Sequence, residues 1–258
     1  MRKDYHMHPT IITRPEYFDQ FVQVALEKGI EEICVTDHMP LSFSKESDRL
    51  PRGTVAEYCA RVREHAKRYE GILTVKCGIE IDYHPTVLDE IEAILEQGSF
   101  DYILGSSHMH HFVKEFERYT VDDFADFAIE NSIKAAESGW FNTISHPDMY
   151  RYAFEHAKRY PLIDSGYDAE KHKDLFRELF RTAKKKGAMI EINPHLAEEK
   201  NDWFYMYPQE PILKWALEEG VSFAYGSDAH KPSSVGAWLD ELENHPLYGI
   251  ALRDWESN

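Results

Sequence analysis

The feature that most constrains the fold of this 258-residue chain is a regular alternation of short apolar segments with amphipathic helical stretches. Because strict alternation of strand and helix is typical of a parallel sheet, and seven repeats favour closure over an open sheet, we predict an α/β barrel. The predicted strands are Asp4–His8, Glu32–Asp37, Leu73–Ile81, Tyr102–Ser106, Asn142–Ser145, Met189–Asn193 and Ser222–Ser227.

The intervening stretches have the period of helices. In residues 15–29, for example, Phe18, Phe21 and Val22 fall on one face of a 3.6-residue repeat. A glycine follows each of six such stretches, where a left-handed residue would end the helix. These glycines are Gly29, Gly71, Gly98, Gly139, Gly187 and Gly220. A barrel needs roughly 200–250 residues, so we expect one domain over residues 1–258.

Composition excludes several classes of protein. Acidic residues outnumber basic ones by 46 to 29 and the net charge is −17, which argues against binding to a nucleic-acid backbone. No apolar run is long enough to span a bilayer, and the N-terminal residues do not resemble a secretion signal. Cys34, Cys59 and Cys77 are far apart and form no metal-binding pair, which indicates a reducing compartment. We therefore expect a cytoplasmic protein that does not bind membranes, and the oligomeric state stays open.

Residues that commonly bind metals gather at the carboxyl ends of six of the seven predicted strands. Isolated histidines are usually packed or surface residues, but random positions would not coincide with strand ends. Active sites of barrels lie at this rim, so we predict a metal site there. Its candidate ligands are His6, His8, Asp37, His38, Glu80, His108, His146, Asp228 and His230.

The spacing within this set supports shared ions. Side chains alternate along a strand, so His6 and His8 point the same way and can bind one ion together. Asp228 and His230 repeat that spacing. Glu80 and Asp228 could bridge ions while the histidines supply neutral nitrogen atoms, a mixed donor set that suits zinc, manganese or iron.

Other polar residues near the rim are candidates for contacts with a substrate. Arg151, close to His146, could hold a phosphate group through paired hydrogen bonds, although a salt bridge is the simpler alternative. His84 and His195 could belong to the surroundings of the metals or have no role. His110 could lie in a surface loop, contact the substrate or act as a redundant metal ligand. Asn193 could contact the substrate or pack. The same two alternatives apply to the aromatic loop of Trp203, Phe204, Tyr205 and Tyr207.

The motifs DYHMH, TDH, GIEID, GSSH, SHPD and GSDAH, in this order and at strand ends, resemble the polymerase-and-histidinol-phosphatase (PHP) superfamily, and within it the histidinol-phosphate phosphatase branch. The resemblance covers nearly the whole chain. It implies a distorted TIM-like (β/α)7 barrel with three divalent metal ions. It carries ligand roles onto His6, His8, His38, Glu80, His108, His146, Asp228 and His230.

Two departures from the family pattern affect these expectations. Some members have a further histidine shortly after the first pair, but residues 11–14 contain none, so Asp37 becomes the candidate to complete the third metal site. The loop SSHMHHFVKEFERY also differs from the pattern associated with histidinol-phosphate enzymes, which leaves the substrate open.

The function implied is hydrolysis of a small phosphate monoester by a metal-bridging hydroxide, with L-histidinol phosphate as the leading substrate. In this scheme Glu80 and Asp228 serve the metals, Arg151 neutralises phosphate charge, and His195 or His84 gives a proton to the leaving group. A nucleotide or sugar phosphate is the alternative substrate. A metal-dependent amidase or deaminase, and a non-catalytic protein that binds metals or anions, are the alternative functions.

Overall fold

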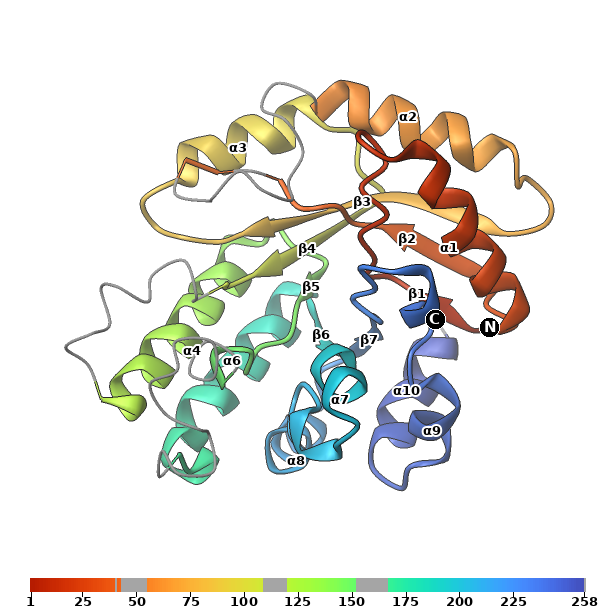
Figure 1. The fold of residues 1–258 in the computed structure, drawn as a ribbon. Helices are drawn as coiled ribbons and strands as arrows, with labels where there is room; N and C mark the ends of the chain where they lie inside the picture. The colour runs from red at the N-terminus through yellow and green to blue at the C-terminus, as the bar shows by residue number, and fades with distance from the viewer. Residues whose placement is uncertain (40, 43–54, 109–119, 152–166, 258) are drawn as a thin grey trace.

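The computed structural model describes residues 1–39, 41–42, 55–108, 120–151 and 167–257. Its seven strands form one parallel sheet in the order of the sequence, and Figure 1 shows them curving around a common centre. The strands are β1 (Lys3–Asp4), β2 (Glu32–Val35), β3 (Thr74–Asp82), β4 (Tyr102–Ser106), β5 (Thr143–Ile144), β6 (Met189–Ile192) and β7 (Phe223–Tyr225).

The two ends of this sheet meet and nearly close the barrel. Beyond β7, the backbone N–H of Asp228 donates to the carbonyl of His6 at 2.7 Å. The N–H of His8 donates to the carbonyl of Ala229 at 2.8 Å, next to a parallel bridge between Met7 and Ala229. The predicted (β/α)7 barrel is confirmed, and its seam sets the His6 and His8 pair beside Asp228.

Helices surround the strands, and their apolar faces complete the core (Figure 1). In the first of them, Phe18, Phe21 and Val22 are buried, as the helical period predicts. The α-helices are α1 (Pro15–Glu27), α2 (Val55–Lys67), α3 (Leu88–Gln97), α4 (Val121–Ser138), α6 (Lys173–Lys186), α7 (His195–Lys200), α8 (Glu210–Glu219), α9 (Leu239–Asn244) and α10 (Tyr248–Ser257). Short 3-10 helices are η4 (Ala169–His172), η5 (Trp203–Tyr205) and η6 (Pro232–Ser234).

The predicted left-handed glycines are confirmed at five of six positions, and Gly98 is the exception. Its φ of −90° and ψ of 144° are extended, and its N–H bonds to the carbonyl of Ile94 at the end of α3. A side chain at this position would overlap with the ring of Phe100. Gly98 therefore provides space for a neighbouring ring rather than a left-handed turn.

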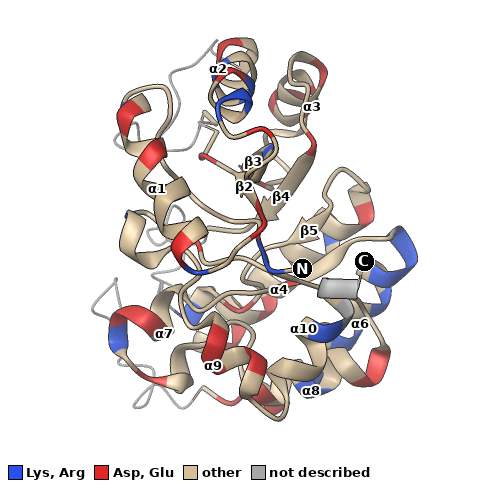
Figure 2. Cartoon of the chain, turned by 90° about the vertical axis from the view of Figure 1, so that its right-hand side faces the viewer, with Lys and Arg blue, Asp and Glu red and all other residues tan. Residues whose placement is uncertain are grey.

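The surface reflects the acidic composition. Figure 2 shows acidic residues spread over several helices, and α3 and α9 carry acidic residues but no lysine or arginine. Arg2 lies against α9 and contacts both Asp240 and Glu243. Among the described residues, no helix is both long and apolar enough to cross a membrane.

Candidate metal centre

Glu80 is at the centre of a buried cluster of imidazoles. It lies in β3 between Ile79 and Ile81, which belong to the hydrophobic core, so its side chain points to the opposite face of the strand. Its Oε2 atom lies 3.2 Å from Nε2 of His6, 3.4 Å from Nε2 of His8 and 2.9 Å from Nδ1 of His38. Its Oε1 atom lies 3.2 Å from Nε2 of His146 and 3.7 Å from Nε2 of His108. One carboxylate thus faces five histidines from four segments of the chain, with His6 and His8 in the same segment.

Asp228 is a second carboxylate of the cluster. Its Oδ1 atom lies 3.1 Å from Nε2 of His8, 3.6 Å from Nε2 of His6 and 3.5 Å from Nδ1 of His230. The backbone of Asp228 has a φ of 54°, and that of His146 has a φ of 25°, both in the region that residues other than glycine seldom adopt. Such strain is often found at functional sites, where the fold holds a side chain in place.

Five overlapping groups of three side chains have their potential ligand atoms within 4.8 Å of one another among the described residues. Eight of the nine predicted ligands are in these groups, and the exception is Asp37. His195 is also in one of them. The full set is His6, His8, His38, Glu80, His108, His146, His195, Asp228 and His230.

Burial and mutual charge shift the ionisation of these groups. Burial opposes the ionisation of Glu80, but His38, His6 and His108 outweigh it and hold the Glu80 pKa well below its usual range. Burial likewise opposes ionisation of Asp228, yet His6 and other histidines keep its pKa well below the ordinary value. For His8, burial and the neighbouring His38 lower the pKa well below the usual value, which leaves a neutral imidazole ready to bind a cation.

Two further carboxylates orient the histidines, and the sequence-based prediction missed both. Glu191 accepts a hydrogen bond from Nδ1 of His6 at 2.6 Å through Oε1, and from the backbone N–H of His146 at 2.9 Å through Oε2. Asp82 contacts Nδ1 of His108 and accepts from the hydroxyl of Ser106 at 2.9 Å. Carboxylates that hold the outer nitrogen of a ligating histidine are common around protein metal sites.

A signal for both residues is present in the sequence. Glu191 is an acid within the apolar strand segment MIEI, and Asp82 follows Glu80 at the two-residue spacing that keeps both on one face. Gly226 provides the room for Glu191, because a side chain there would overlap with Oε1 of Glu191 and Cβ of His6. A buried acid in an interior strand is costly unless it has partners, so it marks a site.

The family to which this architecture belongs is shown by its sequence. Residues 4–195 match the model of the PHP domain family. The chain belongs to the PHP domain family. The resemblance seen in the strand-end motifs is confirmed.

This PHP domain is similar to several proteins known as histidinol-phosphatases. A "Probable histidinol-phosphatase" of Deinococcus radiodurans is 29% identical over 229 residues, which cover 84% of this chain and 81% of that protein. The histidinol-phosphatase of Bacillus subtilis is 22% identical over 258 residues, covering 91% and 96% respectively. The crystal structure of a Lactococcus lactis histidinol phosphate phosphatase, complexed with zinc, L-histidinol and phosphate, has a TM-score of 0.73 at 19% identity and covers 97% of this chain and 93% of that one. At this identity the structural likeness shows the shared fold.

The side chains of the cluster suit divalent metal ions. Imidazole nitrogens and carboxylate oxygens together form a donor set that zinc, manganese and iron accept. The Nδ1 atoms of His8 and His146 are buried and have no hydrogen-bond partner among the described residues. Burial opposes protonation of His6, yet Glu191, Asp228 and Glu80 raise its pKa well above the usual value. A proton on His6 therefore offsets part of the negative charge of these carboxylates. Bound metal cations would offset the same negative charge.

Replacement of Glu191 tests the role of the carboxylates that orient the histidines of the cluster. In the Glu191→Gln variant an amide replaces the carboxylate that holds His6, so we expect metal affinity and phosphatase activity to fall by about 10- to 100-fold. Zinc titration of the metal-free protein measures the affinity. Glu199→Gln, in an exposed position on α7, is the matched control. Equal zinc affinities for Glu191→Gln and the wild type would contradict the orienting role.

Asp37 does not belong to the cluster, which corrects its predicted role as a ligand. Its Oδ1 atom accepts the N–H of Thr10 at 2.8 Å and its Oδ2 atom accepts the N–H of Ile11 at 2.9 Å. Thr10 has a φ of 52°, which is rare for a β-branched residue, and the carboxylate holds this turn. Burial raises the pKa of Asp37 to about 6, against the lowering effect of these two backbone donors. Asp37 thus stabilises the turn after His8.

Replacement of Asp37 with asparagine distinguishes its role in stabilising the turn from its predicted role as a metal ligand. Asparagine has a single acceptor oxygen, so one of the two backbone N–H groups would face an NH2 group. We expect the Asp37→Asn variant to lose about 1–3 kcal/mol of unfolding free energy in urea titrations. Its metal content, measured by mass spectrometry, should equal that of the wild type. Loss of a bound ion without loss of stability would restore Asp37 as a ligand.

Arg151 is not available to a substrate, which contradicts its predicted contact with phosphate and its catalytic role. Its side chain is completely buried, and its guanidinium donates to the backbone carbonyls of Phe204 at 2.9 Å and Met206 at 2.6 Å. It also forms a salt bridge of 2.9 Å with Asp148. Arg151 therefore connects the loop after β6 to the segment after β5. The salt bridge that was the simpler alternative for Arg151 is present, but it is buried.

The remaining predicted substrate contacts have different outcomes. Asn193 is buried, and its amide donates to Glu191 at 3.1 Å and to Asp228 at 3.2 Å, so the structure contradicts a substrate contact. His84 is half-buried outside the ligand groups, with Nδ1 2.7 Å from the hydroxyl of Thr86, and its contact with substrate stays a prediction. His110 lies outside the described residues.

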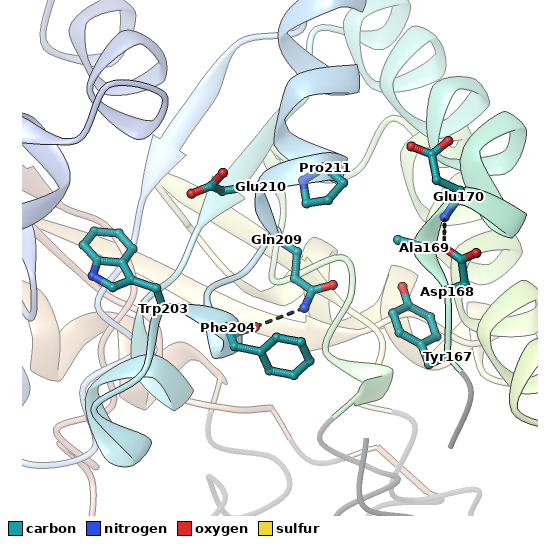
Figure 3. A pocket seen from close by; sticks show the side chains of 9 residues that line it. All are labelled: Tyr167, Asp168, Ala169, Glu170, Trp203, Phe204, Gln209, Glu210 and Pro211. Atoms are coloured by element: carbon teal, nitrogen blue, oxygen red, sulfur yellow. Dashed lines mark hydrogen bonds between the residues drawn. The ribbon is translucent and has the colours of Figure 1, made fainter. Parts of the chain in front are cut away.

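Some side chains of the aromatic loop after β6 pack in the interior, and others line a hollow at the surface. Tyr207 is buried, whereas Trp203 and Phe204 are 38% and 39% exposed. Trp203 and Phe204 line a hollow of about 580 Å³ at the start of α8. Figure 3 shows Gln209 between these residues and Tyr167, with its amide bonded to the carbonyl of Phe204. The hollow adjoins the loop that Arg151 holds in place.

Proposed function

We propose that this PHP domain is a metal-dependent phosphatase that hydrolyses small phosphate monoesters, with L-histidinol phosphate as its preferred substrate. The observation that carries the proposal is the buried cluster in which Glu80 and Asp228 face histidines from several strand ends. The names of the curated relatives in Deinococcus radiodurans and Bacillus subtilis support the choice of substrate.

Three of the ligand groups suggest how ions would be held. His6, His8 and Asp228 form one group, in contact with Glu80. Glu80 also forms a group with His6 and His146, and another with His38 and His108. Glu80 therefore has the position expected of a bridging carboxylate. When bound, divalent ions activate water and stabilise negative charge on a phosphoryl group.

The residues of the chain prepare the site for such ions. Glu191 and Asp82 hold the outer nitrogens of His6 and His108, which fixes the direction in which the other nitrogens point. The carboxylates of Glu80 and Asp228 would repel a phosphate dianion in the absence of cations. Ions bound here reverse the sign of the local charge, so an acidic protein can bind an anionic substrate.

A panel of phosphate monoesters tests the proposal. We expect metal-loaded protein to hydrolyse p-nitrophenyl phosphate and to show its highest kcat/KM with L-histidinol phosphate among nucleotide, sugar and amino-alcohol phosphates. A higher kcat/KM with a nucleotide or sugar phosphate would keep the phosphatase and replace the substrate. Metal bound at full occupancy without turnover of any ester would sink the enzymatic proposal.

The cellular setting remains a prediction. Cys34, Cys59 and Cys77 are free and buried, in agreement with the reducing, cytoplasmic compartment expected from their spacing. Fractionation of cells that express the protein would test the location.

A further inference from the structure

We infer that His195 is a metal ligand, and that together with Asp228 and His230 it forms a divalent-cation site at the solvent-facing edge of the cluster. The inference rests on the proposed metal-dependent function and assigns His195 to the metals instead of to the predicted transfer of a proton. The ligand class is a transition-metal ion such as zinc, which accepts two imidazole nitrogens and a carboxylate oxygen.

The geometry of the three side chains carries the inference. Potential ligand atoms of His195, Asp228 and His230 lie within 4.8 Å of one another. The rings of His195 and His230 are 5.3 Å apart, and the ring of His230 is 4.4 Å from that of His8. The side chain of His230 is 50% exposed, so this group has an open side toward solvent. Three protein ligands would leave a fourth position for water or substrate, as in catalytic zinc sites.

The backbone and Asn193 hold His195 in this position. The side-chain oxygen of Asn193 accepts the N–H of His195 at 2.9 Å, and its amide donates to Oδ2 of Asp228 at 3.2 Å. Asn193 is itself held by two backbone hydrogen bonds with Tyr207, of 2.7 and 3.0 Å. One buried amide thus fixes both His195 and Asp228, which leaves Oδ1 of Asp228 to face the histidines.

One ring nitrogen of His195 also lacks a partner. Its Nδ1 atom is buried and forms no hydrogen bond within the part of the chain that the structure describes. A buried nitrogen without a partner is unfavourable, and coordination to a cation would satisfy it. Asp37, the residue predicted to complete the metal site, is used by the turn at Thr10 and Ile11. His195 is the additional residue that the fold brings to the cluster in its place.

Metal counting tests this assignment directly. Metal-free wild type and the His195→Ala variant are loaded with Zn²⁺, dialysed and analysed by mass spectrometry. We expect His195→Ala to retain one ion fewer per chain, and imidazole added to the buffer to restore that ion. His65→Ala is the matched control, because His65 is also half-buried but lies on α2 outside the ligand groups.

Two further results keep the test decisive. The His195→Gln variant preserves the size of the side chain, and far-UV circular dichroism verifies that both variants fold. Equal Zn²⁺ counts and affinities for wild type and His195→Gln would overturn the assignment of His195 and leave the phosphatase proposal intact. Loss of one ion from His195→Gln, with no ester hydrolysed by the wild type, would support His195 as a ligand and overturn the phosphatase proposal.

Discussion

Replacement of Glu80 with alanine is expected to lower kcat/KM for phosphate monoesters by on the order of 10³-fold or more. Both oxygens of Glu80 face imidazoles, with Oε2 against His6, His8 and His38 and Oε1 against His146 and His108. Alanine removes the charge and both potential bridging atoms at once. The ions expected on the two sides of this carboxylate would then lose their shared ligand, so metal content should fall together with activity.

The measurement uses p-nitrophenyl phosphate and L-histidinol phosphate, with metal analysis of each protein. Glu92→Ala is the matched control, because Glu92 is an exposed glutamate on α3. Glu80→Gln keeps the shape of the side chain and removes the charge. It therefore shows whether the effect of Glu80→Ala comes from loss of the bridging anion or from loss of packing. Unchanged kcat/KM in Glu80→Ala would rule out the proposed centre.

Removal of the metals is expected to abolish activity and to lower the melting temperature. Ions that bind only the folded chain contribute about 2.7 kcal/mol when present at a hundredfold excess over Kd. For a domain of this size that free energy corresponds to a fall of roughly 5–10 °C in Tm. The burial of Glu80 and Asp228 makes the effect larger than at a surface site, because their charges are far from bulk water.

Treatment with a chelator, followed by calorimetry and a phosphatase assay, measures both effects. Addition of zinc or manganese should restore Tm and activity together, and the Glu80→Ala variant should show a smaller response to the chelator. Activity that persists in protein shown to be free of metals would contradict metal dependence. The titration should also release protons, because the carboxylates that surround His6 raise its pKa well above the usual value.

Local sequence patterns predicted the barrel fold and the end of the barrel at which the site lies. The alternation of apolar segments and helical periods indicated the barrel, because each element must bury one face and a parallel strand needs a helical connection. The position of Glu80, His108 and His146 at strand ends indicated the rim, because parallel strands bring their carboxyl ends to one side. Such inferences need only the spacing of residues within one element.

Partners that are distant in sequence could not be predicted in this way. Glu191 and His6 are 185 residues apart. Their hydrogen bond depends on closure of the barrel, which places the segment after β1 beside β7, the neighbour of β6. Asp37 is next to a ligand in sequence, yet its carboxylate turns toward the N–H groups of Thr10 and Ile11. Arg151 is likewise close to His146 but is enclosed by the loop after β6. Residues close in sequence to a metal-binding histidine therefore need not take part in the metal site.

The sequence by itself determined the class of fold, the rim and the types of metal-binding side chain, because these follow from periodicity and from the chemistry of single residues. Only the tertiary structure decided which side chains share a centre. Closure between β7 and β1 brings Asp228 to His6 and His8, and Asn193 binds both the backbone N–H of His195 and the carboxylate of Asp228. The physical reason is that hydrogen bonds and burial distribute carboxylates and imidazoles among competing partners, and that competition takes place only in the folded chain.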